Sequence, residues 1–422
     1  MFSLVEKSIC SYHYEMKIAF FIENYYKGGL DTFLINLINH WPAQDDDLVI
    51  FCNKSHPGIS MYLGHIRYKK MKLYSHSFAH FSNDFRNNRS FPKRILQWLI
   101  KSISILMNFL SCYRRFKHMR LDRLMVVNGG YPAGLTCRAA MIAWRLAGRN
   151  PLAIHNFHND PMPSQKFDFL SMLIDYWVAT SASCFVTVSK NCAQSMSIRK
   201  IISKHAKITY IHNGVEDIRL KSSGASSKRS DQTVRCVMLG TFEERKGHRY
   251  LLEAFHKALL LYPDMQLDIY GFGFPEERMS IEQVISLLEL EASVCVHHFE
   301  SNVVNIYDRA DIVLISSQCY ESFGLVAAES MAMGLPVVST SVGGLPEVIQ
   351  NEVTGFCHDK DDVSDFAASI VKLAKSKELR NQMGGAGRRR YELMFSAQRM
   401  AREYYSLIVH DRTTFSSNCA KQ

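Results

Sequence analysis

Glu321-Ser-Phe-Gly-Leu-Val-Ala-Ala-Glu329 places two carboxylates eight residues apart around one glycine. The apolar run before it, residues 311–316, predicts a buried strand. The segment after it, Gly334-Leu-Pro336, supplies a glycine and a proline, which commonly end a helix. The stretch therefore predicts a loop that contains Glu321 and a helix that opens at Gly324 and carries Glu329 inside it.

This strand-to-helix junction suits an anionic ligand. A helix N-terminus presents unpaired N–H groups and partial positive charge, which favour a diphosphate. The predicted helix is apolar on nearly every side, so Glu329 would be buried, and a buried carboxylate needs a partner such as a ligand hydroxyl. A diphosphate with a hydroxyl-bearing ring at each end is a nucleotide sugar. The spacing alone would also fit a solvated face or a capping pair.

Several segments resemble one known family. Residues 311–356 resemble the donor-binding core of the retaining GT-B glycosyltransferases of family 4, and Gly240-Thr-Phe-Glu-Glu-Arg-Lys-Gly247 resembles that family's phosphate loop. Leu267–Gly273 resembles its next strand and glycine turn, and residues 16–22 followed by Gly28-Gly29 resemble its first strand and glycine loop. The resemblance covers most of residues 16–410. It implies an α/β, GT-B fold, in which two doubly wound Rossmann-like domains face each other across a cleft.

A chain of 422 residues is long enough for two domains. Alternating apolar and helical segments predict two parallel sheets, separated by a Ser-rich linker. Met16, which lies just before the first predicted strand, is an alternative first residue of the translated protein. The expected division is a disordered extension (1–15), an acceptor-side domain (16–216), a linker (217–233), a donor domain (234–395) and a helix that in the family crosses back to the first domain (396–412).

The resemblance also implies roles for individual residues. Glu321 would contact sugar hydroxyls near the reacting carbon, Glu329 the ribose hydroxyls, and Lys246 the departing phosphate, whose charge a catalyst must stabilise. His158 would hydrogen-bond the donor sugar, with His155 as the rival, and Arg245 could replace an arginine that many relatives carry where this chain has Thr241. The complete set of expected donor contacts is Gly28, Gly29, Thr241, Gly271, Gly273, Ser322, Phe323, Gly324, Leu325, Val326 and Glu329.

The sequence predicts no metal site and no cofactor. Residues 45–47 are three aspartates that read as a loop before a strand. Asp359-Lys-Asp361 imitates a D-x-D metal motif, but it falls where a helix N-cap is expected, and its lysine would repel a cation. Lys246 and the helix N-terminus are expected to neutralise the diphosphate instead.

The charge distribution and the cysteine content indicate which cellular compartment and which partners to expect. Of the 50 basic residues 27 lie in residues 1–213, against only 12 of the 40 acidic ones. The 11 cysteines form no C-x-x-C pair, and no signal peptide is evident, so the expected location is the cytoplasm. No recognised nucleic-acid motif accompanies the basic residues, so no nucleic-acid partner is expected.

One helical segment has two interpretations. Apolar residues recur at helical spacing in residues 95–110, and basic residues crowd both ends of residues 93–123. The segment is either a core-facing helix or a peripheral contact with an anionic membrane surface.

Taken together, the sequence predicts a retaining hexosyltransferase that uses a nucleoside-diphosphate sugar. The expected acceptor is a saccharide or a lipid-linked saccharide, as in polysaccharide or glycoconjugate biosynthesis. A GT-B nucleotide-sugar epimerase and a catalytically lapsed nucleotide-sugar-binding protein remain the alternatives.

Overall fold

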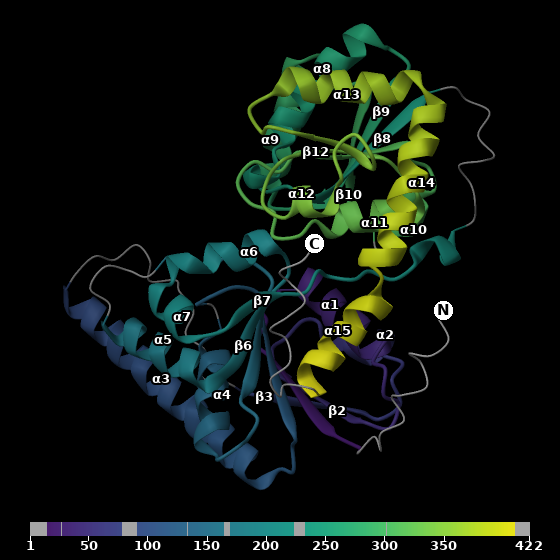
Figure 1. Ribbon diagram of the computed structural model, residues 1–422. Coiled ribbons are helices and arrows are strands. Elements are labelled where there is room, and N and C mark those ends of the chain that lie inside the picture. Colours follow the sequence, from purple (N-terminus) through teal and green to yellow (C-terminus); the bar gives the residue numbers. More distant parts are fainter. Residues whose placement is uncertain are drawn as a thin grey trace. The chain divides into compact units, whose positions relative to one another are not determined.

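The computed structural model describes residues 15–26, 28–77, 91–132, 134–163, 169–222, 233–300 and 302–409, with the backbone alone for residues 91–98 and Lys101. The described chain forms two compact units (Figure 1). Unit 1 holds residues up to Val186, residues 196–209 and residues from Tyr404 onward, and unit 2 holds residues 187–195 and 210–403.

Unit 1 is built on a seven-stranded sheet with the order β3-β2-β1-β4-β5-β6-β7. Its strands are β1 (Lys17–Ile22), β2 (Asp47–Asn53), β3 (Met71–His76), β4 (Arg123–Asn128), β5 (Ala153–Phe157), β6 (Ala182–Thr187) and β7 (Ile208–Tyr210). The helices that belong to it are α1 (Gly29–Asn39), α2 (Ile59–His65), α3 (Phe91–His118), α4 (Leu135–Leu146), α5 (Phe169–Ser181), η2 (Met196–Ile198) and α7 (Lys200–His205).

Unit 2 is built on a six-stranded sheet with the order β10-β9-β8-β11-β12-β13, and its strand pairs are parallel. The strands are β8 (Val234–Thr241), β9 (Met265–Phe272), β10 (Val294–His298), β11 (Ile312–Ile315), β12 (Val337–Thr340) and β13 (Gly355–His358). The helices are α6 (Lys190–Ser195), η3 (Ile218–Lys221), η5 (Glu244–Lys246), α8 (His248–Leu261), α9 (Pro275–Leu287), α10 (Val303–Tyr307), α11 (Leu325–Met333), α12 (Leu345–Val348), α13 (Val363–Lys375) and α14 (Lys377–Met394).

The alternating direction of successive side chains along the strands explains why helices cover both faces of the sheet in unit 2. Met238 of β8 and Ile269 of β9 point into one apolar core, whereas Val237 and Val313 point into another. Because successive side chains of a strand point to opposite faces, an unbroken apolar strand buries both faces and needs helices on each. The predicted pair of parallel, doubly wound sheets is confirmed.

Two edge strands were not predicted. Strand β3 has the sequence Met-Lys-Leu-Tyr-Ser-His, which contains no apolar run, and its side chains are only partly buried or exposed. Strand β13 has four residues and begins at a glycine. Edge strands are short and partly polar, which weakens the pattern that marks a strand.

The two units also divide the chain differently from the expected domain bounds. Residues 187–195 belong to unit 2, because Glu347 accepts hydrogen bonds from the backbone N–H groups of Lys190 and Asn191 at 2.8 and 2.7 Å. The last helix, α15 (Ala397–Val409), contributes residues to both units, with the change at Tyr404. Residues 1–14, 223–232 and 410–412 of the expected extension, linker and last helix lie outside the described residues.

Among the described helices, none has the length and apolar character needed to cross a bilayer.

Candidate active site

The predicted donor residues that belong to unit 2 lie around the point where the strand order of its sheet reverses. Strand β8 is followed in the chain by β9 on one side, but its neighbour on the other side is β11. Ligands of open parallel sheets bind at such switch points, beyond the carboxyl ends of the strands. The loops after β8 and β11 are joined there, since Ser316 Oγ donates to Lys246 O at 2.8 Å and the N–H of Gln318 donates to Arg245 O at 2.8 Å.

The centre of this site is an ion pair between two residues far apart in the sequence. Lys246 Nζ lies 2.6 Å from Glu321 Oε2, and the two side chains are 17% and 18% exposed. Ser317 Oγ donates to the same carboxylate oxygen at 3.3 Å. The aliphatic part of Lys246 passes over Gly240, where a Cβ would lie 3.7 Å from it. The cation is therefore held at the end of β8, within reach of the loop that carries Glu321.

Gly324 opens helix α11, as the sequence predicted. It is the N-cap residue with φ +98°, and a Cβ there would lie 2.7 Å from Leu345 Cδ2. Positive φ of this kind is costly for any residue with a side chain. The first N–H groups to bond to Gly324 O are those of Ala327 and Ala328, which leaves the amides of Leu325 and Val326 without an intrahelical acceptor.

Glu329 is the fifth residue of α11, just over one turn from its start, and has a protein partner. Tyr307 OH donates to Glu329 Oε2 at 2.8 Å. Burial raises the pKa of Glu329 to about 7, and the hydrogen bond from Tyr307 opposes that rise. Burial and the neighbouring Glu329 also raise the pKa of Tyr307 well above its ordinary value. The carboxylate to which the family resemblance assigns the ribose therefore has a pKa close to neutral pH.

Arg245 is held beside the ion pair. Its Nε donates to Glu243 Oε2, and its guanidinium stacks on the ring of Tyr320, with 4.9 Å between the carbon and the ring centroid. Thr241, where many relatives have an arginine, ends β8. Arg245 is therefore a second cation in this loop, restrained by a carboxylate and an aromatic ring.

Other predicted donor residues serve packing. Gly271 lets β8 and β9 approach each other, because a Cβ there would meet Gly240 O at 2.0 Å, and a Cβ at Gly273 would meet Glu277 Oε2 at 2.5 Å. The Phe323 ring is buried against Phe395, so that only its backbone can face a ligand. Ser322 Oγ is buried without a hydrogen-bond partner among the described residues.

The two candidate histidines of unit 1 have different surroundings. His155 is fully buried among aromatic rings, 4.2 Å from the centroid of Phe157, and its ring nitrogens have no described hydrogen-bond partner. His158 follows the end of β5, and its Nε2 lies 2.7 Å from Asn156 Oδ1. Burial lowers the pKa of both histidines to about 3. His158 is therefore the candidate at the strand end, whereas His155 belongs to the core.

The hydrogen bonds of Asn156 define the tautomer of His158. Asn156 Nδ2 donates to Val186 O and to Tyr404 OH, at 3.3 and 2.8 Å. Its Oδ1 is then the acceptor, so His158 Nε2 carries the proton and Nδ1 is the acceptor atom. A neutral His158 in this tautomer can accept a hydrogen bond from a hydroxyl group through Nδ1.

The glycine loop of unit 1 rests on a buried aspartate that was not predicted. Gly28 has no atom within 4 Å of its added Cβ, and Gly29 starts α1. Asp31 accepts from Gly28 N at 3.1 Å and from Tyr62 OH at 2.7 Å, and it pairs with His56 Nε2 at 2.9 Å. The sequence signal was an acidic residue three positions after a glycine N-cap.

The acidic motifs judged not to bind metal have structural partners. Asp46 accepts from Met16 N and from Trp41 Nε1, at 3.0 and 2.9 Å. Asp362, next to the D-x-D-like motif, caps α13 by accepting from Asp365 N at 2.9 Å. In the described part of the chain one group could hold a metal ion, Asp268, Cys295 and His297 on β9 and β10, and none of its members was among the predicted site residues.

Two family models match this chain. Residues 223–390 match the Glycosyl transferases group 1 family, and residues 27–219 match Glycosyltransferase Family 4. Together they cover both units, including the loops after β8 and β11.

Individual relatives and structures agree with these matches. N-acetyl-alpha-D-glucosaminyl L-malate synthase from Bacillus anthracis is 31% identical over 171 residues, which are 40% of this chain and 44% of that relative. The match thus spans less than half of the relative's length. A glycosyltransferase from Rickettsia africae ESF-5 superposes with a TM-score of 0.74 at 17% identity, over 95% of this chain and 100% of that one.

A further structure, HepE from Anabaena in complex with UDP-glucose, gives a TM-score of 0.70 at 16% identity, over 92% of this chain and 98% of that one. At such identities the superpositions establish the fold. The fold, the junction that carries Lys246 and Glu321, and the two family models lead to one conclusion: the chain belongs to glycosyltransferase family 4, with a GT-B fold.

Proposed function

We propose that this protein is a retaining glycosyltransferase that moves a hexose-type sugar from a nucleoside-diphosphate sugar to a saccharide or lipid-linked saccharide. The observation that carries the proposal is the pair of Lys246 and Glu321, 2.6 Å apart beside the glycine that opens α11. A cation, free amides and a carboxylate at one switch point suit a diphosphate that bears a sugar.

Each group has a role in this proposal. Negative charge develops on the diphosphate during transfer, and it is stabilised by the backbone amides at the start of α11 together with the side chains of Lys246 and Arg245. Such electrostatic stabilisation is often the largest single contribution to catalysis. Glu321 accepts hydrogen bonds from the sugar, and Glu329 does so from the ribose. His158 accepts a hydrogen bond from a sugar hydroxyl through Nδ1. No metal ion or cofactor has a part, because the protein's own cations neutralise the donor.

The expected setting is the cytoplasm, where thiols stay reduced. The described cysteines are free, as a reducing compartment requires. A lipid-linked acceptor would bring the enzyme to an anionic membrane surface through residues 93–123.

Product analysis distinguishes the proposal from its alternatives. UDP-, GDP-, ADP- and TDP-sugars are screened for thermal stabilisation, starting with UDP-glucose because HepE was solved with it. The stabilising donor is then incubated with saccharide acceptors, and the anomeric configuration of the product is read by NMR. A product that keeps the donor's configuration is expected. Release of the free, isomerised sugar would favour an epimerase, and donor binding without any product would favour a lapsed enzyme.

A further inference from the structure

Helix α3 turns its apolar stripe away from the core. Its exposed apolar residues recur at helical spacing and are 43–58% exposed: Leu99, Ile103, Leu106, Met107 and Leu110. The opposite side, toward α4, buries Ser104 and Asn108, and Asn108 Nδ2 donates to Thr136 Oγ1 at 3.2 Å. The interpretation of this stripe as core-facing is therefore wrong for the described side chains, while Ile95 lies outside them.

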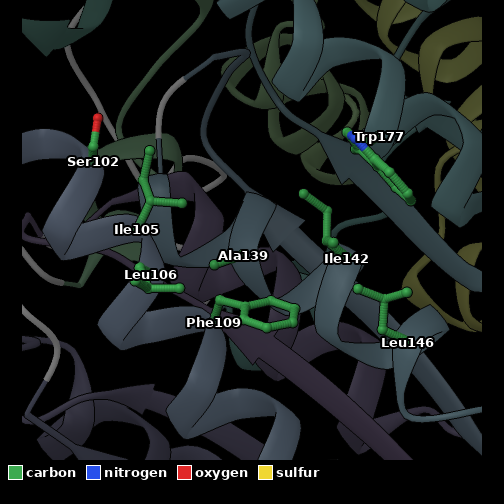
Figure 2. Close-up of a pocket in the computed structure, with 8 residues that line it drawn as sticks. All are labelled: Ser102, Ile105, Leu106, Phe109, Ala139, Ile142, Leu146 and Trp177. Carbon is green, nitrogen blue, oxygen red and sulfur yellow. The ribbon is translucent and has the colours of Figure 1, made fainter. Parts of the chain in front are cut away.

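The apolar surface continues from α3 onto α4 and α5. Figure 2 shows a groove lined by Ser102, Ile105, Leu106, Phe109, Ala139, Ile142, Leu146 and Trp177. Its volume, about 270 Å³, is below the roughly 300–1,000 Å³ of pockets that enclose small ligands. Helix α5 adds exposed side chains beside it: Phe169, Met172, Leu173, Tyr176 and Trp177. The three helices thus form one broad apolar surface rather than an enclosed pocket.

The exposed charged side chains that the structure describes on these helices and on the neighbouring α7 are basic. These exposed basic residues are Arg114 and Lys117 in the last turns of α3, Arg120 just after it, Arg145 on α4, and Lys200 and Lys204 on α7, which packs beside α5. Helices α3, α4, α5 and α7 contain a single acidic residue, Asp175. It is buried and pairs with Arg199 at 2.8 Å. These four helices therefore expose cations and no carboxylate.

We propose that the face formed by α3, α4 and α5 binds the surface of an anionic lipid bilayer. Its apolar side chains enter the boundary between headgroups and acyl chains, and its cations contact lipid phosphates. Trp177 and Tyr176 suit that boundary, because their rings are apolar and their N–H and O–H groups are polar. This face supplies the residues for the membrane contact in the proposed function and so rests on it, but vesicle binding can be measured without any sugar transfer.

A second copy of the chain fits this face less well. A two-fold dimer sets the same surface of each copy against the other. Cations such as Arg114 and Arg145 would then face an equally cationic surface, with no exposed carboxylate on these helices to pair with them. An anionic bilayer satisfies the apolar and the basic residues together.

Vesicle flotation of the full chain tests the proposal. Wild type is expected to float with phosphatidylcholine vesicles that contain 30% phosphatidylglycerol and to stay unbound with phosphatidylcholine alone. Ile103→Glu/Leu106→Glu should abolish flotation. Arg114→Gln/Lys117→Gln should weaken binding about 30-fold at low salt, since each basic residue near an anionic surface contributes about fivefold. The matched control, Leu260→Glu/Leu287→Glu, changes two apolar residues of unit 2 that are each 72% exposed, and it should float like wild type.

Two further measurements distinguish the remaining outcomes. Thermal unfolding should be nearly unchanged in every variant, because the altered side chains are exposed, and nucleotide-diphosphate binding should be retained. Light scattering reports the oligomeric state. Failure of wild type to bind anionic vesicles would overturn the proposal, as would a dimer that Ile103→Glu/Leu106→Glu converts to a monomer without any vesicle binding. Equal loss of flotation in the unit 2 control would also overturn it.

Discussion

Replacing Glu321 by Gln should distinguish the role of Lys246 in binding phosphate from the role of Glu321 in sugar transfer. The carboxylate of Glu321 holds the ammonium group of Lys246 at 2.6 Å, and both side chains are less than one-fifth exposed. Exposed pairs contribute about 0–1 kcal/mol, and removing one partner of a fully buried pair costs about 3–5 kcal/mol, so a cost of about 1–2 kcal/mol is reasonable for losing this partly exposed pair. In the variant the lysine loses this partner and is available to a phosphate.

UDP affinity should therefore change in opposite directions in two variants. Glu321→Gln should bind UDP about fivefold more tightly, because about 1 kcal/mol no longer has to be spent on separating the pair. Lys246→Met should bind UDP roughly 10- to 100-fold more weakly, since a hydrogen bond to a charged group contributes about 1.5–3 kcal/mol. Both variants should lose about 100-fold or more in transfer rate.

Calorimetry with UDP and with the UDP-sugar, and a double-mutant cycle on the unfolding temperature, measure these effects. The cycle should return a coupling of about 1–2 kcal/mol between the two residues. Glu282→Gln is the matched control, because Glu282 pairs with Arg278 at 2.8 Å on the surface of the same unit. If Glu321→Gln weakens UDP binding as much as Lys246→Met does, the reasoning that the lysine serves the phosphate is refuted.

Four further predictions concern the donor site. Because burial raises the pKa of Glu329 to about 7, nucleotide binding through the ionised carboxylate should tighten between pH 6 and 8, and Glu329→Gln should bind with a flat pH profile. The stability that protonated Glu329 contributes is lost as pH rises from about 4.5, the ordinary pKa of a glutamate, to about 7, so wild type should lose unfolding temperature relative to Glu329→Gln across that range and run level with it at higher pH. Parallel curves between pH 4.5 and 7 would contradict this. Gly324→Ala should cost about 2 kcal/mol, or roughly 4–8 °C in unfolding temperature, because φ is +98° there, and an unchanged melting curve would count against this strain. Transfer should persist in EDTA, whereas complete loss that Mg²⁺ restores would show that the donor needs a metal ion.

The sequence by itself determined the central strands of both sheets and the strand-to-helix junction of the donor unit, but not the edge strands β3 and β13. Unbroken apolar strands require helices on both faces, and the glycine at 324 marks the start of α11, because both effects are local consequences of side-chain chemistry. Those local signals were enough to place Glu321 and Glu329 around a helix N-terminus.

Only the tertiary structure decided which groups meet. Lys246 follows β8 and Glu321 follows β11, so their contact requires these two strands to be neighbours. Neither the sequence around Lys246 nor the sequence around Glu321 specifies that strand order. The same holds for Asp31, whose partners His56 and Tyr62 come from a later part of the chain. For α3 the spacing predicted an apolar stripe, but its direction depends on how the helix packs, since periodicity defines a face without saying what lies against it.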